Sequence, residues 1–164
     1  MQMKFAVLDF ETTGDQITDD IIQAGLVIID NNQVVEQYTS FVKTGRSIPA
    51  FITQLTGITD EMVEDAPKLS VVAGELQRRM AGCVLVAHHA PFDFAFLQRA
   101  LEKSYLPPFT GKVLDTYDMV KILYPGMPSL QLSFICSALG IPHERPHRAD
   151  CDAMATAQVW LHCL

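Results

Sequence analysis

The run of strand-like segments in the first part of the chain constrains the fold most. Short apolar stretches at Phe5–Asp9, Ile21–Ile29 and Val34–Val42 have the composition and length of β-strands. The last two flank the turn-prone residues 30–32, which favours a hairpin. Three successive strands with short connections predict a meander at one side of a sheet.

After residue 68 the pattern changes to an alternation of helices and strands. Apolar side chains recur at helical spacing over 69–80, and Gly82 ends that helix. A buried strand at Val84–Ala87 precedes a helix that begins near Pro91. One short strand and three helices complete the chain, at 113–114, 116–123, 130–139 and from 149 onward. This order predicts an α/β fold, with a mixed sheet flanked by helices.

Length and composition indicate one globular domain over residues 1–164. The hydrophobic fraction is 49% and the charged fraction 19%, so the chain can bury a core. No apolar run approaches the roughly 20 residues of a membrane span, and strand-like sequence begins at Phe5, without a secretory signal. A cytoplasmic location is expected.

The cysteines and one histidine pair argue against disulfides and zinc. His143 and His147 have the i, i+4 spacing of a helical zinc pair, but Pro142 and Pro146 disfavour a helix there. The four cysteines are scattered without a C-x-x-C pair, which predicts reduced, mostly buried thiols at Cys83, Cys136, Cys151 and Cys163.

The net charge of −7, with 12 basic against 19 acidic residues, predicts weak non-specific binding to duplex DNA. Carboxylates gathered around cations would account for the excess of acid. Asp9 and Glu11 are two residues apart, so on a strand both side chains lie on one face. Taken alone, this pair is equally typical of a solvated strand end.

Two later segments add further candidates. Asp93 falls in the first turn of the helix near Pro91, where an acid is ordinary because the helix dipole favours it. His147 precedes the last helix, and Asp152 falls in its first turns, so both can face one cleft. Asp150 lies about 200° around that helix from Asp152 and is interpreted as structural.

Together these residues have a chemistry that none has singly. Carboxylate oxygens suit Mg²⁺ or Mn²⁺, and two such ions can support phosphodiester cleavage. A neutral histidine close by can take the proton of a water. Of the five histidines, only His147 has a position expected of such a base.

Three motifs in order resemble the DnaQ-like exonucleases of the DEDDh branch. D-x-E-T-T-G is matched over 9–14, H-N-A-x-F-D over 88–93 with His89 in place of the usual Asn, and H-x-A-x-x-D over 147–152. The resemblance implies a ribonuclease H-like fold with a five-stranded mixed sheet. It also implies a 3′→5′ exonuclease that releases nucleoside 5′-monophosphates from single-stranded DNA.

The resemblance assigns roles residue by residue. Two divalent cations would be held by Asp9, Glu11, Asp93 and Asp152, with His147 as general base. Nucleotide contacts would come from Thr12, Thr13, Thr56, Gly57 and Phe92. Leu55 and Ile58 either wedge against the terminal base or pack the core of a short helix. Asp115 is interpreted as a helix cap, and His89 is expected to affect rate or substrate preference.

Segments 48–52, 54–58 and 146–150 are also similar to the exonuclease domain of DinG-type helicases and PolC-type polymerases. A domain of such a longer chain and a free-standing enzyme are both consistent with this likeness. Two alternatives stay open: an exoribonuclease of the same fold, and a non-catalytic nucleic-acid-binding or interaction module.

Overall fold

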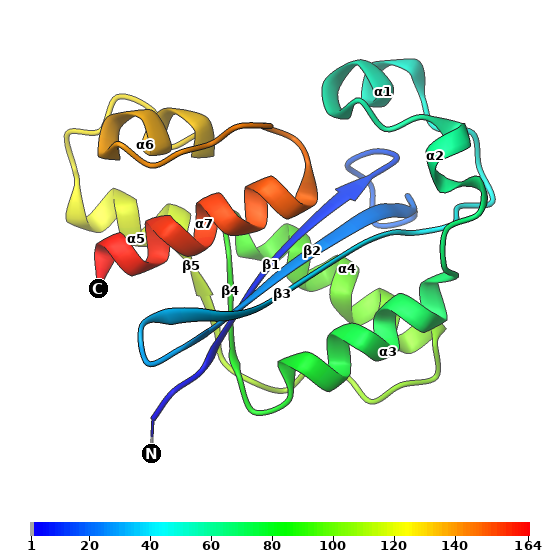
Figure 1. The fold of residues 1–164 in the computed structure, drawn as a ribbon, viewed down its shortest axis with the longest axis horizontal. Helices are drawn as coiled ribbons and strands as arrows, with labels where there is room; N and C mark the ends of the chain where they lie inside the picture. The colour runs from blue at the N-terminus through cyan, green and yellow to red at the C-terminus, as the bar shows by residue number, and fades with distance from the viewer. Residues whose placement is uncertain (1) are drawn as a thin grey trace.

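A computed structural model describes residues 2–164 and confirms the predicted mixed sheet (Figure 1). The described strands are β1 Phe5–Thr12, β2 Ile21–Asp30, β3 Gln33–Phe41, β4 Val84–Ala87 and β5 Val113–Asp115. The described helices are α1 Ala50–Thr56, α2 Asp60–Glu64, α3 Leu69–Met80, α4 Ala90–Lys103, α5 Thr116–Leu123, α6 Leu132–Leu139 and α7 Ala149–Cys163.

The five strands form one sheet in the order β3-β2-β1-β4-β5. β1 pairs antiparallel with β2 and parallel with β4, while β4 pairs parallel with β5. The antiparallel half is the predicted meander, and the parallel half is reached through the helical crossovers. The carboxyl ends of β1, β4 and β5 therefore lie at one edge of the sheet.

Side chains of β1 alternate between two cores. Ala6, Leu8 and Phe10 pack with residues of α3 and α4 on one face. Phe5 and Val7 pack on the other face with Ala153, Ala157 and Trp160 of α7. Because alternation continues along the strand, Asp9 and Glu11 lie on the α7 face. In Figure 1, α7 runs across one side of the sheet while α3 and α4 cover the other.

Two boundaries differ by more than one residue from the sequence prediction, and two short helices are additional. β1 continues past Asp9 to Thr12, because Thr12 still pairs with Ile21 after an irregularity at Glu11. α6 begins at Leu132 instead of residue 130, since the carbonyl of Leu130 is bonded to the His88 ring. Helix α2 was not predicted, and α1 was considered only as the short helix that Leu55 and Ile58 could pack. Both helices are short, and their apolar side chains Ile52 and Val63 are buried against Ile22 of β2.

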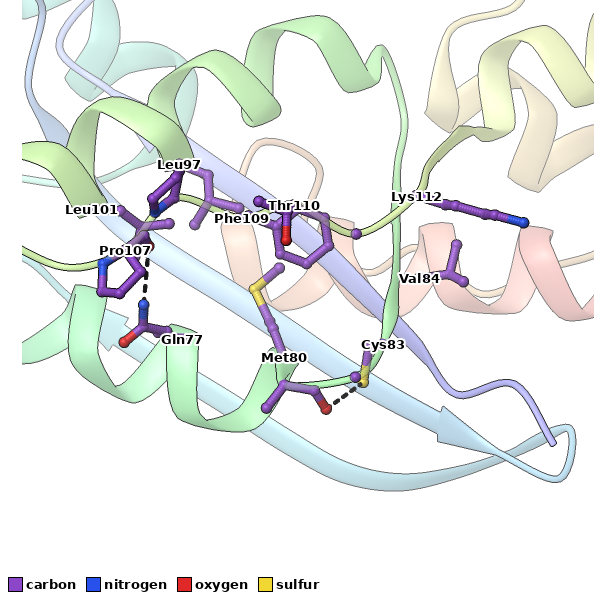
Figure 2. Close-up of a pocket in the computed structure, with 14 residues that line it drawn as sticks. Gln77, Met80, Cys83, Val84, Leu97, Leu101, Pro107, Phe109, Thr110 and Lys112 are labelled. Carbon is purple, nitrogen blue, oxygen red and sulfur yellow. Dashed lines mark hydrogen bonds between the residues drawn. The ribbon is translucent and has the colours of Figure 1, made fainter. Parts of the chain in front are cut away.

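Two general features bear on function. Among residues 2–164, no helix combines the length and apolar character that crossing a bilayer requires. A hollow of about 450 Å³ lies beside the start of β4, between α3, α4 and the loop before β5; the apolar side chains of Met80, Leu97 and Phe109 line it (Figure 2). Its lining residues include none of the predicted site residues.

Candidate metal centre and active site

Three carboxylates from the two ends of the sequence meet on the α7 face of the sheet. One oxygen from each of Asp9, Glu11 and Asp152 lies within 4.8 Å of the other two. β1 supplies the first two at adjacent positions of one face, and the first turn of α7 supplies the third. All three line one hollow of about 480 Å³, together with Asp93 and His147.

The fourth predicted ligand, Asp93, has a second attachment. Its side chain is only 3% exposed, and its Oδ1 accepts a hydrogen bond of 3.0 Å from the backbone N–H of Phe10. This bond connects the first turn of α4 to β1, between the two acidic residues of that strand. Asp93 is therefore not an ordinary solvated acid at a helix start, which was the alternative from sequence.

Burial and mutual repulsion disfavour the charged forms of these acids. The pKa of Asp9 is raised well above its usual value by burial, and by the neighbouring carboxylates of Asp93, Glu11 and Asp152. Burial, followed by the charge of Asp152, raises the pKa of Glu11 to about 8. Four acids held this close require protons or cations between them.

The geometry of this site fits a hard divalent cation. Among the described residues, Oδ2 of Asp9 is buried and has no hydrogen-bond partner. A buried carboxylate oxygen without a donor is costly unless something positive occupies the space beside it. The surrounding donors are all carboxylate oxygens, which Mg²⁺ and Mn²⁺ prefer. Asp9, Glu11 and Asp152 are thus suited to hold such an ion, and Asp93 lies next to them.

Close contact between α7 and β2 sets the position of Asp152. Gly25 lies opposite Asp9 in the β1–β2 register, and a Cβ atom there would come within 2.1 Å of the Ala149 carbonyl oxygen. The side chain of Gln23, 3% exposed, accepts a 2.8 Å hydrogen bond from the Ala149 N–H. The sequence prediction missed both residues, since only the fold shows what each one faces.

His147 and Asp152 line the same hollow, as their spacing predicted. The backbone N–H of His147 donates to Oδ2 of Asp152 at 3.1 Å, and its exposed side chain stands at the rim. Residues 141–148 form no helix, in agreement with the effect of the two prolines. The general-base role of His147 stays a prediction.

A second histidine, which the sequence prediction left out, also reaches the site. Nε2 of His143 lies 2.6 Å from Oδ1 of Asp152, and the His143 side chain is 7% exposed. His147 is therefore not alone among the histidines in its proximity to the carboxylates. A signal was available in the i, i+4 spacing, but only the loop geometry shows that the ring of His143 turns toward Asp152.

Residues 88–93, the second motif, form a hydrogen-bonded junction between β4, α4 and α5. Asp115 caps α5 by accepting from the N–H of Tyr117 at 2.9 Å, which confirms its predicted role. The same carboxylate accepts 3.0 Å hydrogen bonds from the N–H groups of His89 and Ala90, at the start of α4. His89 has a positive φ of 61°, a conformation that Asn and His tolerate better than most residues. This explains how His can stand where Asn is usual.

His88 anchors the same junction. Its Nε2 lies 2.8 Å from the carbonyl oxygen of Leu130, and its Nδ1 lies 2.9 Å from Oγ1 of Thr116. Burial lowers the pKa of His88 below its usual value. The neutral ring therefore donates from Nε2 to the carbonyl and accepts from the Thr116 hydroxyl.

The five predicted nucleotide contacts lie in three places. The hydroxyls of Thr12, Thr13 and Thr56 are buried and bond within the protein, to Gly14 O, Asp19 Oδ1 and Ile52 O respectively. The backbone N–H of Thr13 is also engaged, donating to the carbonyl oxygen of Asp20 at 2.8 Å. Gly57 ends α1 with a φ of 74°. Phe92 lines the hollow beside Asp9 and packs on Phe96, with ring centroids 4.8 Å apart.

The two apolar candidates Leu55 and Ile58 differ in exposure. Ile58 is fully buried in the cluster beneath α1, which agrees with core packing. Leu55 is 50% exposed on α1, as is its neighbour one turn earlier, Phe51, at 63%. Leu55 is thus free to contact a ligand, whereas Ile58 is not.

Comparisons with known proteins agree with this geometry. The sequence model of the exonuclease family RNase T matches residues 6–160. The 3′-5′ exonuclease DinG of Staphylococcus aureus strain USA300 is 40% identical over 158 residues, covering 96% of this chain but 18% of that protein. The same values hold for DinG of strain NCTC 8325. The chain therefore spans less than a fifth of the length of these relatives.

Solved structures of E. coli exonuclease I have the same fold. The zinc-bound complex with single-stranded DNA has a TM-score of 0.86 at 19% identity, and covers 98% of this chain and 40% of that one. The complex with a dT13 oligonucleotide has a TM-score of 0.88 at 19% identity, with 98% and 41% covered. The expected ribonuclease H-like architecture and the DnaQ-like resemblance are confirmed, and the chain belongs to the RNase T exonuclease family.

Proposed function

We propose that this protein is a 3′→5′ exonuclease that hydrolyses single-stranded DNA from its 3′ end and releases nucleoside 5′-monophosphates. The observation that carries the proposal is the carboxylate cluster of Asp9, Glu11 and Asp152 beside Asp93, on a fold shared with exonucleases. The relatives support the substrate, since DinG is named a 3′-5′ exonuclease and exonuclease I was solved with single-stranded DNA.

The proposed ligands of two divalent cations, Mg²⁺ or Mn²⁺, are Asp9, Glu11, Asp93 and Asp152. When bound, such ions neutralise the scissile phosphate, lower the pKa of a water and stabilise the departing oxygen. The chain's own contribution is to hold the carboxylates together and to present a base. The exposed ring of His147, at the rim of the hollow, takes a proton from the attacking water.

The proposed nucleotide site lies between the end of β1 and α1. Thr12, Thr13, Thr56 and Gly57 contact the terminal nucleotide, and Phe92 forms one wall beside Asp9. Leu55, half exposed on α1, lies against the terminal base. The low positive charge of the chain agrees with recognition of one strand end instead of a long duplex.

A pair of matched substitutions tests the cluster. Asp152→Asn should lower the release of mononucleotides from a single-stranded DNA substrate by at least roughly 10²-fold, because loss of a ligand is more severe than loss of an outer partner. Asp150→Asn, an exposed acid two residues earlier, should leave the rate within about twofold of wild type. Equal rates for wild type and Asp152→Asn would contradict the assignment.

The two open alternatives have separate outcomes. Matched DNA and RNA oligonucleotides with Mn²⁺ distinguish the substrates, and faster hydrolysis of RNA would favour an exoribonuclease of the same fold. Strand binding without release of mononucleotides at any Mg²⁺ or Mn²⁺ concentration would favour a non-catalytic module.

The curated relatives are much longer than the matched region, which is 18% of their length. We therefore also propose that the natural protein carries a fused helicase or polymerase domain, and acts on DNA in the cytoplasm. Sequencing of the surrounding gene tests this directly.

A further inference from the structure

His143 lies on the segment between α6 and α7, with its ring between two polar side chains. Nε2 is 2.6 Å from Oδ1 of Asp152, and Nδ1 is 3.3 Å from Oγ of Ser133. The ring is 7% exposed and lines a hollow of about 300 Å³ that shares His147 and Asp152 with the carboxylate site. A polar ring this deeply buried is held in one orientation by its two partners.

The partners also determine which ring atom carries the proton. The ionised Asp152 carboxylate, the form that binds a cation, can only accept, so Nε2 of His143 is then the donor. In the neutral ring Nδ1 then has a lone pair, and the Ser133 hydroxyl donates to it. The series Ser133–His143–Asp152 thus runs from the first turn of α6 to the first turn of α7.

Asp152 is restrained at both oxygens by this one segment. Oδ1 accepts from His143, and Oδ2 accepts from the backbone N–H of His147 at 3.1 Å. Each carboxylate oxygen has two lone pairs, so each keeps one for another partner. Asp9 contrasts with this, because its Oδ2 has no partner among the described residues.

We propose that His143 is a positioning residue, whose Nε2–H holds the Asp152 carboxylate in the orientation that binds a divalent cation, with Ser133 orienting the ring. The proposal rests on the metal-dependent function proposed above. Hydrogen bonds from an outer histidine fix the direction of a metal-binding carboxylate, and their loss typically weakens metal binding about 10–100-fold. The sequence motifs assign no role to His143, which lies outside all three.

The test measures Mn²⁺ binding without nucleic acid, by the electron paramagnetic resonance signal of free Mn²⁺ and by calorimetry. His143→Leu should raise the Kd for Mn²⁺ about 10–100-fold. His143→Gln, whose amide nitrogen can take the place of Nε2, should restore most of the affinity. Ser133→Ala removes only the orienting hydroxyl and should have a smaller effect.

The control is His162→Leu, the same change at an exposed histidine near the end of α7. It should bind Mn²⁺ as the wild type does. Circular dichroism and thermal unfolding in EDTA show whether each variant is folded. If His143→Leu does not fold, the comparison of His143→Gln with His143→Ala decides instead.

Activity separates positioning from a general structural defect. At saturating Mn²⁺ the rate of His143→Leu should return to within a few-fold of wild type, since the defect lies in metal affinity. A wild-type Kd for Mn²⁺ in the folded Leu variant, or tighter binding, would overturn the proposal. Because binding is measured without substrate, a wild-type protein that binds Mn²⁺ but leaves DNA intact contradicts only the proposed function.

Discussion

Two histidines at the site adopt left-handed backbone conformations. His89 has a φ of 61° and His147 a φ of 63°. Each turns the chain sharply just before an acid-bearing helix, α4 with Asp93 and α7 with Asp152. The motifs predicted these residues by type, but a sequence pattern does not show backbone angles. The structure therefore adds a conformational reason for the residue type at two positions that the motifs identified by their chemistry.

His89 allows a direct test of this conformational role. Substitution to Val should destabilise the protein by roughly 1–2 kcal/mol more than substitution to Asn, because a β-branched residue is strained at positive φ and Asn is not. Both variants lose the contact of the ring with Tyr117, whose centroid is 4.1 Å away, so their difference isolates the backbone. Thermal unfolding in EDTA measures it. Equal stabilities would contradict the interpretation.

The pKa of Glu11 gives a pH dependence of stability. An unfolded Glu titrates near 4.5, whereas the folded value is about 8. Between these values the folded state keeps a proton that the unfolded state releases, so metal-free stability should fall as pH rises from about 4.5 to 8. Above pH 8 the Glu11 carboxyl is ionised in both states, and the folded state carries the full cost of holding this charge buried.

Glu11→Gln removes this titration. At pH 8 in EDTA it should be more stable than wild type by at least about 1.4 kcal/mol, the free energy of one pKa unit, and the difference should shrink toward pH 4.5. Urea unfolding at several pH values checks this. An unchanged slope of stability against pH would show that the Glu11 carboxyl does not resist ionisation in the fold.

At the scale of elements, the strands and longer helices followed from periodicity, but their mutual placement did not. The predicted ranges 69–80, 84–87 and 116–123 agree with α3, β4 and α5. The short helices α1 and α2 have seven and five residues, too few for a helical repeat to stand out. That α7 crosses β2 at Gly25 depends on residues far apart in sequence, which a local pattern cannot show.

Gly25 should tolerate no side chain. A Cβ at this position would lie 2.1 Å from the Ala149 carbonyl oxygen, so Gly25→Ala must displace the start of α7 and with it Asp152. We expect a loss of stability of about 1–3 kcal/mol, and weaker Mn²⁺ binding. Calorimetric unfolding and Mn²⁺ titration measure both effects.

Gly74→Ala is the matched control. Gly74 lies within α3, and apart from the nearby backbone of that helix nothing lies within 4 Å of a Cβ placed there. Alanine should stabilise the helix by about 0.5–1 kcal/mol and leave Mn²⁺ binding unchanged. If both substitutions have the same effect, close packing at Gly25 is not what positions α7.

At the scale of the whole molecule, the sheet separates the chemistry from a second, apolar hollow. The carboxylates lie toward the carboxyl ends of the parallel strands, while the hollow beside Met80 and Phe109 lies where β4 and β5 begin. Gln98 of α4 holds the loop at this end, accepting from the Phe109 N–H at 2.9 Å and donating to its carbonyl at 2.8 Å. The two ends should therefore respond independently to substitution.

Gln98→Leu tests this independence. It leaves the backbone groups of Phe109 without their partner and should cost about 1–3 kcal/mol of stability, with an unchanged Kd for Mn²⁺. Gln158→Leu, on the exposed side of α7, should change neither quantity. Urea unfolding and Mn²⁺ titration provide the comparison, and weaker Mn²⁺ binding in Gln98→Leu would show coupling between the two ends.

The placement of Asp152 in α7, opposite the acids of β1, has a consequence for protein synthesis. On a ribosome, β1 emerges early with Asp9 and Glu11. The cluster lacks its last acid, Asp152, until that residue has been translated and α7 has docked. A nascent chain therefore cannot assemble the complete cluster before α7 has left the ribosome. Any nuclease activity is therefore withheld until α7 has been translated and has docked on the sheet.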